Sequence, residues 1–256
     1  MRTVFLAWQD PQARCWFPIG RLDFDGNNYT FGYIEGAREA ERNCAFEPLR
    51  SFPELDQIYQ SKDLFPLFAN RLPPESRSDY GQYVEWLNVA ENPAEPIALL
   101  ARNGGRKVTD SFEVYPAPER QQDGSYHIHF FVHGLRHLPK ENVRRIDTLR
   151  PNEDLLIVHD LQNPHDPSAL MLRTNDKTDG DRYFVGYLPR YIVEDVHTIL
   201  KECKNTPEVH VERINLAPAP LQMRLLCILT ACWPEKFRPF ASELYQPISS
   251  QLSTPA

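Results

Sequence analysis

The first half of the chain alternates apolar and polar positions in a way that predicts a small sheet followed by helices. Residues 3–8 (TVFLAW) form an apolar run rich in strand-forming residues. The segment 21–34 alternates on both sides of Asp25-Gly26-Asn27, which predicts a hairpin, because an Asp-Gly pair supplies the positive φ angles of a tight turn. Apolar residues at helical spacing follow over 64–72 and over 80–89.

The second half predicts five or six short strands and one strong helix. Strand patterns cover 127–135, 154–161, 168–174, 183–188 and 208–215, and a helical pattern covers 191–203. Residues 221–232 are apolar enough for either a closing strand or a buried helix. This arrangement is typical of a small, partly closed barrel with a helical cover. The expected fold class is therefore α/β (α+β), with a small N-terminal sheet and helices and a small C-terminal six-stranded barrel.

Two stretches interrupt these patterns. NPAEP at 92–96 and YPAPERQQDGS at 115–125 are rich in proline and polar residues. Proline lacks a donor N–H and glycine tolerates unusual dihedral angles, so the longer stretch reads as a linker. The tail beyond Tyr245 is small and polar without periodicity, which predicts disorder. We expect a first domain over 1–118, a second domain over 126–245 and a disordered tail over 246–256.

Length and charge fit two small globular domains. The chain has 256 residues, of which 41% are hydrophobic and 25% charged. The net charge of −7 at first argues against nucleic acid, but residues 1–125 carry 13 basic and 19 acidic residues, a balance of −6. Residues 126–256 carry 15 basic and 16 acidic residues, so this half can still bind a polyanion through a local basic patch, with modest non-specific affinity.

The sequence shows no sign of secretion or membrane insertion. Its start (MRTVFLAWQDPQARCWF) lacks an apolar run of secretory length, and no segment approaches the roughly 20 apolar residues of a spanning helix. We therefore expect a soluble, cytoplasmic protein without membrane contact. The five cysteines are odd in number and lack a CxxC pair, which favours reduced, mostly buried thiols over a disulfide framework or a zinc site.

Three segments of the second half, in order, resemble the HIRAN domain. They are GLRHL at 134–138, DLQNPHDPSALML at 160–172 and VGYLPR at 185–190, which a predicted helix follows. The resemblance runs from about Ile128 to about Ile214. Its most specific part is NPxD at 163–166 before an apolar strand, together with GYLP at 186–189. The resemblance implies a small six-stranded barrel with two helices that binds single-stranded DNA and holds its free 3′ hydroxyl.

The residues at these positions suit such a ligand. Asn163 and Asp166 lie in a predicted turn at a strand entry, where an amide and a carboxylate can accept a hydrogen bond from a terminal hydroxyl. The carboxylate would repel a phosphate, which favours a strand end over an internal phosphodiester. Arginines offset backbone charge, and flat side chains stack on bases, which is worth roughly 1–3 kcal/mol per base. The candidate nucleic-acid-binding residues are Arg136, His137, Asn163, His165, Asp166, Tyr187 and Arg190.

Some of these residues depart from the family pattern. By resemblance, the family's Arg-aromatic-aromatic segment corresponds to Arg136, His137 and Leu138. Leu138 cannot stack on a base as an aromatic side chain would, so we expect weaker or altered binding of the first base. Tyr187 takes the place of a histidine, and Arg190 that of a lysine. Taken alone, NPHD at 163–166 is more often a plain Asx turn that caps a hairpin, and the 136 and 186–190 segments in order favour ligand binding.

The first half resembles the N-terminal subdomain of HipA-type Ser/Thr kinases. The matching pieces are GRLDFDGNNYTFGY at 20–33, LFPLFANRLPPESR at 64–77 and NGGRKVTDSFEVYP at 103–116. Such a kinase needs a downstream core with an activating lysine, a catalytic aspartate and a metal-binding Asp/Asn pair. The HIRAN-like segment occupies that place. His159-Asp160 with Asn163 only superficially resembles a kinase catalytic loop, because the spacing is too short.

Other enzyme classes find less support, so we expect a non-catalytic chain with no cofactor and no metal. His127, His129 and His133 point the same way from one predicted strand, but no carboxylate or thiol follows at ligand spacing. A solvated strand face explains them better. Gly104-Gly105-Arg106 is a glycine turn rather than a GxxxxGKS phosphate loop, and neither GxSxG nor HExxH occurs.

These observations predict a two-part recognition protein. The second domain would bind single-stranded DNA or a DNA 3′ end, and the first, with its acidic balance, would bind another protein. One alternative is an antitoxin-like regulator that holds a separately encoded HipA-type kinase, with the second domain as a scaffold. Another is an anti-phage defence sensor that uses both activities.

Overall fold

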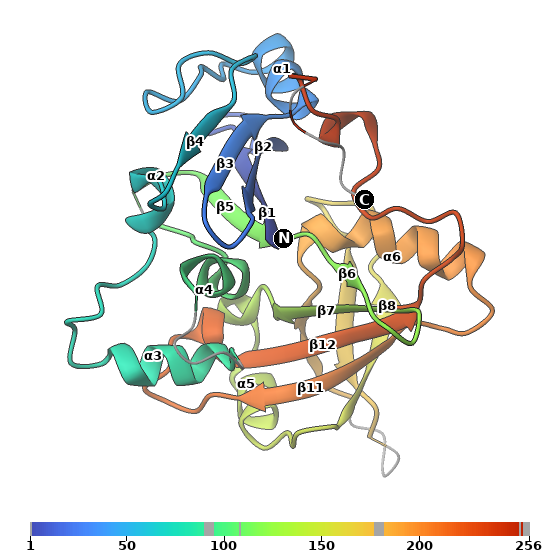
Figure 1. The fold of residues 1–256 in the computed structure, drawn as a ribbon. Coiled ribbons are helices and arrows are strands. Elements are labelled where there is room, and N and C mark those ends of the chain that lie inside the picture. Colours follow the sequence, from blue (N-terminus) through green and yellow to red (C-terminus); the bar gives the residue numbers. More distant parts are fainter. Residues whose placement is uncertain (1, 90–94, 108, 177–181, 251, 253–256) are drawn as a thin grey trace. The chain divides into compact units, whose positions relative to one another are not determined.

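A computed structural model of the chain describes residues 2–89, 95–107, 109–176, 182–250 and 252 (Figure 1). The chain divides into two compact units. The first unit consists of residues 1–85, 89–117 and 238–256, and the second of residues 86–88 and 118–237. The main boundary lies between Ala117 and Pro118, inside the stretch that the sequence predicts as a linker.

The first unit is built on a five-stranded sheet with the order β4-β3-β2-β1-β5, in which all neighbours are antiparallel. In chain order its elements are β1 (Arg2–Gln9), β2 (Trp16–Phe24), β3 (Tyr29–Tyr33), α1 (Glu35–Asn43), β4 (Tyr59–Ser61), α2 (Pro66–Ala69), α3 (Tyr80–Leu87), α4 (Pro96–Asn103), β5 (Phe112–Pro116) and a 3₁₀ turn at Glu243–Tyr245. The expected N-terminal sheet with helices is confirmed.

The predicted hairpin is present as β2 and β3. Asp25 accepts hydrogen bonds from the backbone N–H groups of Asn27 and Asn28, both at 2.7 Å, and Gly26 has a φ of +101°. The resulting register places Leu22 opposite Phe31, and both side chains are fully buried in the core of this unit. The helix expected over 64–72 is only the single turn α2, because Pro66 starts it late and two prolines follow Leu72.

The other face of the first sheet is covered by the end of the chain. Phe240 and Tyr245 pack against Phe5 and Tyr115, with ring centroids 4.9–5.9 Å apart within this cluster. The Tyr115 and Tyr245 hydroxyls are hydrogen-bonded at 2.9 Å. Residues 238–245 therefore belong to the first unit rather than to the second domain.

Residues 246–250 and 252 of the predicted disordered tail lie in the first unit. Pro247 forms an antiparallel bridge with Ile34, and Leu252 is buried. The aromatic residues Phe240 and Tyr245, which pack on the first sheet, precede this segment, so its own polar composition gave no sign of these contacts. Residues 251 and 253–256, the remainder of the predicted tail, lie outside the described residues.

The second unit contains a curled seven-stranded sheet with the order β10-β9-β8-β11-β12-β7-β6. Its elements are β6 (Glu119–Arg120), β7 (Ser125–Phe131), a 3₁₀ turn at Leu135–His137, α5 (Lys140–Asp147), β8 (Asp154–His159), β9 (Leu170–Thr174), β10 (Phe184–Tyr187), α6 (Arg190–Glu202), β11 (Glu208–Ile214), a 3₁₀ turn at Leu221–Met223 and β12 (Leu225–Cys232). Six strands form the half-barrel, and β6 adds a two-residue edge, which confirms the expected architecture.

Pairing settles the ambiguous apolar segment at 221–232. Its main part is β12, which lies between β7 and β11 and is buried on both faces over Leu225–Cys227. The core of the unit is completed by α6, whose Ile192, Val196 and Ile199 are buried against the strands. None of the helices in the described part of the chain has the length and apolar character needed to cross a membrane.

The cysteines differ from the sequence-based expectation. Cys203, at the end of α6, and Cys232, at the end of β12, form a disulfide with their Cα atoms 6.4 Å apart. The sequence does not indicate this pair, because the two residues are 29 positions apart and meet only through the packing of α6 on the sheet. Of the three free thiols, only that of Cys227 is buried, and this burial raises its pKa.

Candidate nucleic-acid interface

The curled sheet comes closest to closing at Tyr187. His133, two residues beyond β7, and Tyr187, the last residue of β10, exchange two backbone hydrogen bonds of 3.0 Å. Gly186 and Gly134 make this approach possible. A Cβ on Gly186 would lie 2.5 Å from the His133 carbonyl oxygen, and a Cβ on Gly134 would lie 3.2 Å from the Tyr187 ring. The bridge thus places the 134–138 segment beside Tyr187.

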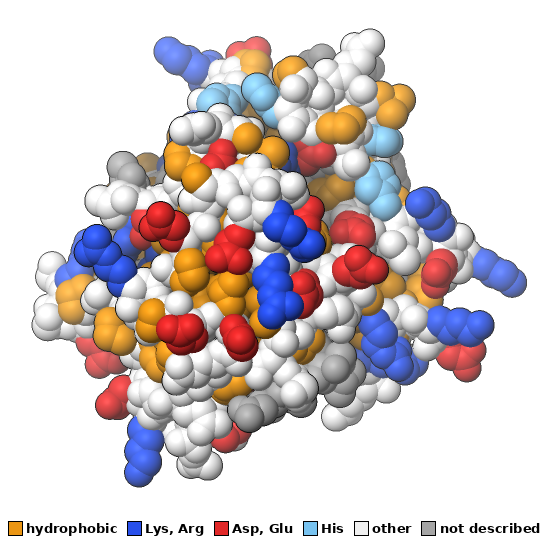
Figure 2. All heavy atoms as spheres, turned by 90° about the horizontal axis from the view of Figure 1, so that it is seen from above, with side chains coloured by type: hydrophobic (Ala, Val, Ile, Leu, Met, Phe, Trp, Pro, Cys, Tyr) orange, Lys and Arg blue, Asp and Glu red, His pale blue; other side chains and the backbone are white. Residues whose placement is uncertain are grey.

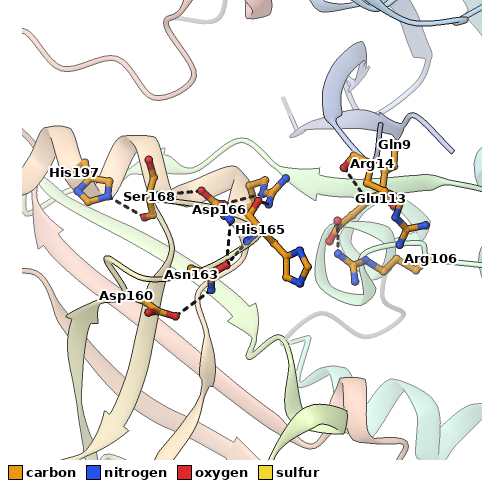
Figure 3. Close-up of polar contacts among 11 residues, drawn as sticks. Gln9, Arg14, Arg106, Glu113, Asp160, Asn163, His165, Asp166, Ser168 and His197 are labelled. Atoms are coloured by element: carbon orange, nitrogen blue, oxygen red, sulfur yellow. Dashed lines mark hydrogen bonds and ion pairs between the residues drawn. The ribbon is translucent and has the colours of Figure 1, made fainter. Parts of the chain in front are cut away.

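The loop between β8 and β9 is organised by Asn163. Its side-chain oxygen accepts hydrogen bonds from the backbone N–H groups of His165 and Asp166, both at 3.0 Å, while its Nδ2 donates to Asp160 at 3.0 Å (Figure 3). This is the Asx turn that the Asn-Pro sequence predicts. The Asn163 amide is therefore occupied by the loop itself. It shapes the site, and the prediction that its oxygen accepts a ligand hydroxyl stays a prediction.

Asp160 connects this loop to β10. Its Oδ2 accepts hydrogen bonds from the Tyr187 hydroxyl at 2.9 Å and from Asn163 Nδ2 at 3.0 Å. The hydrogen bonds from Asn163 and then Tyr187 lower the pKa of Asp160, so the carboxyl is ionised at neutral pH. Burial, followed by the bond to Asp160, raises the pKa of Tyr187, whose phenol stays protonated and donates.

Asp166 connects the same loop to α6. Its Oδ2 accepts from Arg190 Nε at 2.9 Å, and its Oδ1 accepts from the backbone N–H of Ser168 at 3.0 Å. The Arg190 side chain is 47% exposed, so one edge of the guanidinium still faces solvent. Each carboxylate oxygen thus has one protein donor and can accept a further hydrogen bond, so the prediction that Asp166 binds a terminal hydroxyl stays a prediction.

Arg136 and His137 lie on the exposed 3₁₀ turn after β7, where Arg136 Nε donates to His137 Nε2 at 2.9 Å. No carboxylate lies within ion-pair distance of Arg136 among the residues with described positions, so its charge is available to a ligand. Leu138, the departure from the aromatic pattern, is partly buried and packs against the core. Its side chain therefore contributes to the packing of the fold.

Two histidines contact backbone carbonyl groups of the loop between β8 and β9. His159 Nε2 lies 3.0 Å from the Pro167 carbonyl oxygen and His197 Nε2 lies 3.1 Å from that of Ser168. The two rings are in edge contact at 5.2 Å. Figure 3 shows the His197 contact beside the bonds of Asp160, Asn163 and Asp166. Sequence reasoning missed these supports because neither histidine lies in a recognisable motif.

The structure therefore brings the predicted residues together. Asn163, His165, Asp166, Tyr187 and Arg190 belong to one hydrogen-bonded network, and Arg136 and His137 adjoin it through Gly134. Asp160 is the important omission, since the sequence analysis weighed it only as part of a kinase-like loop. Its position near the end of the strand predicted over 154–161, three residues before Asn163, was the available signal.

The other candidate sites do not form such a network. His127 lies 2.9 Å from Ser125 Oγ, and His129 contacts Glu212. Among the described residues, no group of three or more histidine, cysteine, aspartate and glutamate side chains is placed to hold a metal. A cavity of about 460 Å³ in the second unit is lined by residues such as Leu149, Glu212 and Leu216 and by none of the predicted binding residues.

Residues 126–256 carry 15 basic and 16 acidic residues, and ion pairs such as Arg190–Asp166 further reduce their free positive charge. A nucleic acid would therefore be held by a few specific contacts more than by a broad basic surface. On the face of the molecule that Figure 2 presents, acidic and basic side chains are interspersed, with hydrophobic side chains between them.

Comparison with known proteins agrees with the position of this network. The family model of the HIRAN domain matches residues 125–227. A crystal structure of a protein from Lactobacillus plantarum is 19% identical, with 42% of this chain and 97% of that chain covered and a TM-score of 0.31. The HIRAN domain of human HLTF is 19% identical, with 44% and 84% covered and a TM-score of 0.28. No curated protein matches the chain. Residues 125–227 are therefore a HIRAN domain.

Proposed function

We propose that the HIRAN domain of this chain binds single-stranded DNA and prefers a strand with a free 3′ hydroxyl. The observation that carries the proposal is the convergence of three distant segments, 134–138, 160–168 and 184–190, on one network around Tyr187. These are the segments in which the sequence resembles the HIRAN family. The exposed Arg136, two residues beyond Gly134, adds a positive charge to the same segment.

Each exposed group has a chemical task in this proposal. Arg136 and the solvent-facing edge of Arg190 contact phosphates, while His137, His165 and Tyr187 offer flat faces to bases. Asn163 and Asp166 act mainly by building the loop and holding Arg190 in place. Because Arg190 already shares its charge with Asp166, Arg136 should supply the larger part of the phosphate attraction.

Fluorescence anisotropy with labelled oligonucleotides tests the proposal. Wild-type protein should bind a single strand ending in a 3′ hydroxyl more tightly than the same strand ending in a 3′ phosphate. Arg136→Ala should weaken binding to both strands and lower the slope of log affinity against log salt by about 1. Arg150→Ala is a matched control, because Arg150 is an exposed arginine that precedes β8, at the end opposite His159 and Asp160.

The two outcomes that would contradict the proposal are distinct. Equal affinity of the wild type for both ends would remove the preference for a 3′ hydroxyl. No binding to either strand at low salt would remove DNA binding altogether. A loss of DNA affinity in Arg150→Ala as large as that in Arg136→Ala would indicate general charge attraction instead of a defined binding site.

For the first unit we propose an interaction with another protein, supported by the acidic balance of residues 1–125 and their resemblance to the HipA N-terminal subdomain. The family match lies entirely within the second half, so the resemblance, the HipA-type kinase partner and the absence of catalysis remain predictions. Pull-down with the full chain from cells that carry the gene should recover a stoichiometric protein. Recovery of a kinase would favour the antitoxin-like alternative, and recovery of a helicase or nuclease the DNA-end sensor.

A further inference from the structure

The exposed face of α5 carries two cations without an ion pair. Lys140 and Arg144 are exposed and one helical turn apart, so their side chains lie on the same face of the helix. Within the described ranges of the chain, no carboxylate lies within ion-pair distance of either. The same holds for exposed Arg136, four residues before Lys140. These three residues, called the 136–144 row below, form a line of cations that begins at the candidate site.

The inner face of α5 is fixed to the second unit by polar contacts. Asn142 Nδ2 donates to the Phe184 carbonyl oxygen at 2.7 Å. Arg145 is held by Glu153 and, at 2.7 Å, by Asp176. The helix that carries the row is therefore already in place, so little conformational freedom has to be lost when a ligand binds to it.

The row leads away from the site along β10. Gly134 lies against the Tyr187 ring, at the end of that strand, whereas Asn142 bonds to Phe184, at its beginning. Three residues of a strand span about 10 Å, so the chain from 134 to 142 follows the length of β10. A ligand bound at Tyr187 can thus continue over α5.

The charge on this face is positive overall. Glu141 is the exposed acid on α5, so three cations of the row less one acid give a balance of +2. The other long helix of this unit differs, because exposed Glu194, Lys201 and Glu202 mix the two signs on α6. A polyanion is therefore attracted to α5 more than to α6.

We propose that the 136–144 row holds the sugar-phosphate backbone of single-stranded DNA on the 5′ side of the nucleotides bound at the site. The inference rests on the proposed function and extends it from the strand end to the nucleotides that precede this end. Lys140 and Arg144 lie about 6 Å apart along the helix axis, close to the separation of neighbouring phosphates in an extended strand. Each cation can therefore contact its own phosphate, independently of base sequence.

Paired substitutions test the row in the full chain. Lys140→Ala with Arg144→Ala removes two charges and retains helix-favouring residues. Lys201→Ala with Lys204→Ala is the matched control, because both lysines are exposed near the C-terminal end of α6 and the loss of charge is equal. Glu141→Gln changes the same face in the opposite direction, and a folding defect cannot mimic the gain in affinity that we expect from it.

Competition anisotropy, in which unlabelled thymidine strands with a 3′ hydroxyl displace one labelled strand, measures the affinity for each strand length. Wild type should bind a strand of about 12 nucleotides more tightly than one of about 3. The Lys140/Arg144 variant should lose about tenfold in affinity for the long strand at low salt, with little change for the short one, and its slope of log affinity against log salt should fall by about 1.4. Glu141→Gln should bind the long strand about twofold more tightly, and the control pair should behave as wild type.

Uncharged methylphosphonate linkages on the 5′ side of the last few nucleotides locate the contact. They should weaken long-strand binding by the wild type as much as the paired substitution does, and should weaken binding by the Lys140/Arg144 variant little further, because its contacts are already lost. Equal affinity of the wild type for short and long strands, or an equal loss in the control pair, overturns this inference alone. No binding of any strand by the wild type overturns the proposed function together with the inference.

Discussion

Gly186 offers a direct test of how the curled sheet closes around the site. Its φ is +128°, and a Cβ would lie 2.5 Å from both the His133 carbonyl oxygen and Val132 Cγ1. The carbonyl cannot move away without breaking the two 3.0 Å hydrogen bonds between His133 and Tyr187. We therefore expect Gly186→Ala to open the bridge between His133 and Tyr187, which brings Gly134 close to the Tyr187 ring.

The magnitude follows from two separate costs. A residue with a Cβ in a sparsely populated backbone region costs on the order of 1–3 kcal/mol. Overpacking against a backbone oxygen and a buried methyl group adds about 1–3 kcal/mol. Gly124→Ala isolates the first cost, because Gly124 has a φ of +79° but its nearest neighbours are atoms of the Arg120 guanidinium at 3.5–4.0 Å, the end of a flexible side chain.

Urea unfolding combined with hydrogen exchange measures the stability of both variants in the full chain. Exchange resolved on peptides from β7 and β10 reports the free energy of opening where the bridge lies. Gly186→Ala should lower it by about 2–6 kcal/mol and Gly124→Ala by about 1–3 kcal/mol. DNA affinity should fall in Gly186→Ala alone. Equal destabilisation by the two variants would refute the close approach of β10 to the chain beyond β7.

Three further predictions concern stability. Hydrogen bonds from Asn163 and Tyr187 lower the pKa of Asp160 in the folded chain. Its ionised form therefore stabilises the folded chain above the ordinary carboxyl pKa of about 3.9, and this contribution is lost as the pH falls through the pKa of the folded state. Acid unfolding followed by circular dichroism should be less steep in Asp160→Asn. Cys203→Ser removes the cross-link to Cys232 and should lower the free energy of unfolding by about 3–4 kcal/mol. Reductant should destabilise the wild type and have no further effect on this variant. A wild type whose stability does not change with reductant would contradict the disulfide. Truncation after residue 237 removes buried Phe240 and Tyr245 from the first sheet and should lower the stability of the first unit by about 3–6 kcal/mol. Limited proteolysis of the first unit should become faster. An unchanged cleavage pattern would show that this segment does not cover the sheet.

Much of the site could be predicted from sequence because its parts are locally encoded. Asn163-Pro164 specifies a turn in which the asparagine side chain replaces a backbone acceptor, and that turn is present. The partners of the individual side chains were not predictable in the same way. Asp166 pairs with Arg190, 24 positions away, and no local pattern indicates that contact.

The sequence by itself determined the elements whose pattern repeats over a few residues. Alternation predicted β7, β8, β9, β10 and β11, helical periodicity predicted α6, and Asp25-Gly26 predicted the first hairpin. Short-range patterns suffice for these because hydrogen bonding within a helix or turn, and the alternation of side chains along a strand, depend only on near neighbours.

Only the tertiary structure decided which distant groups meet. The Asp160–Tyr187 bond spans 27 positions, the Cys203–Cys232 disulfide spans 29, and Tyr245 returns to Tyr115 across 130. Each contact depends on sheet register and on the packing of a whole face, and no local pattern contains that information. The same physics explains why the polar composition of the tail does not reveal its contacts: Phe240 and Tyr245 precede the tail, and they pack on β1, at the other end of the chain.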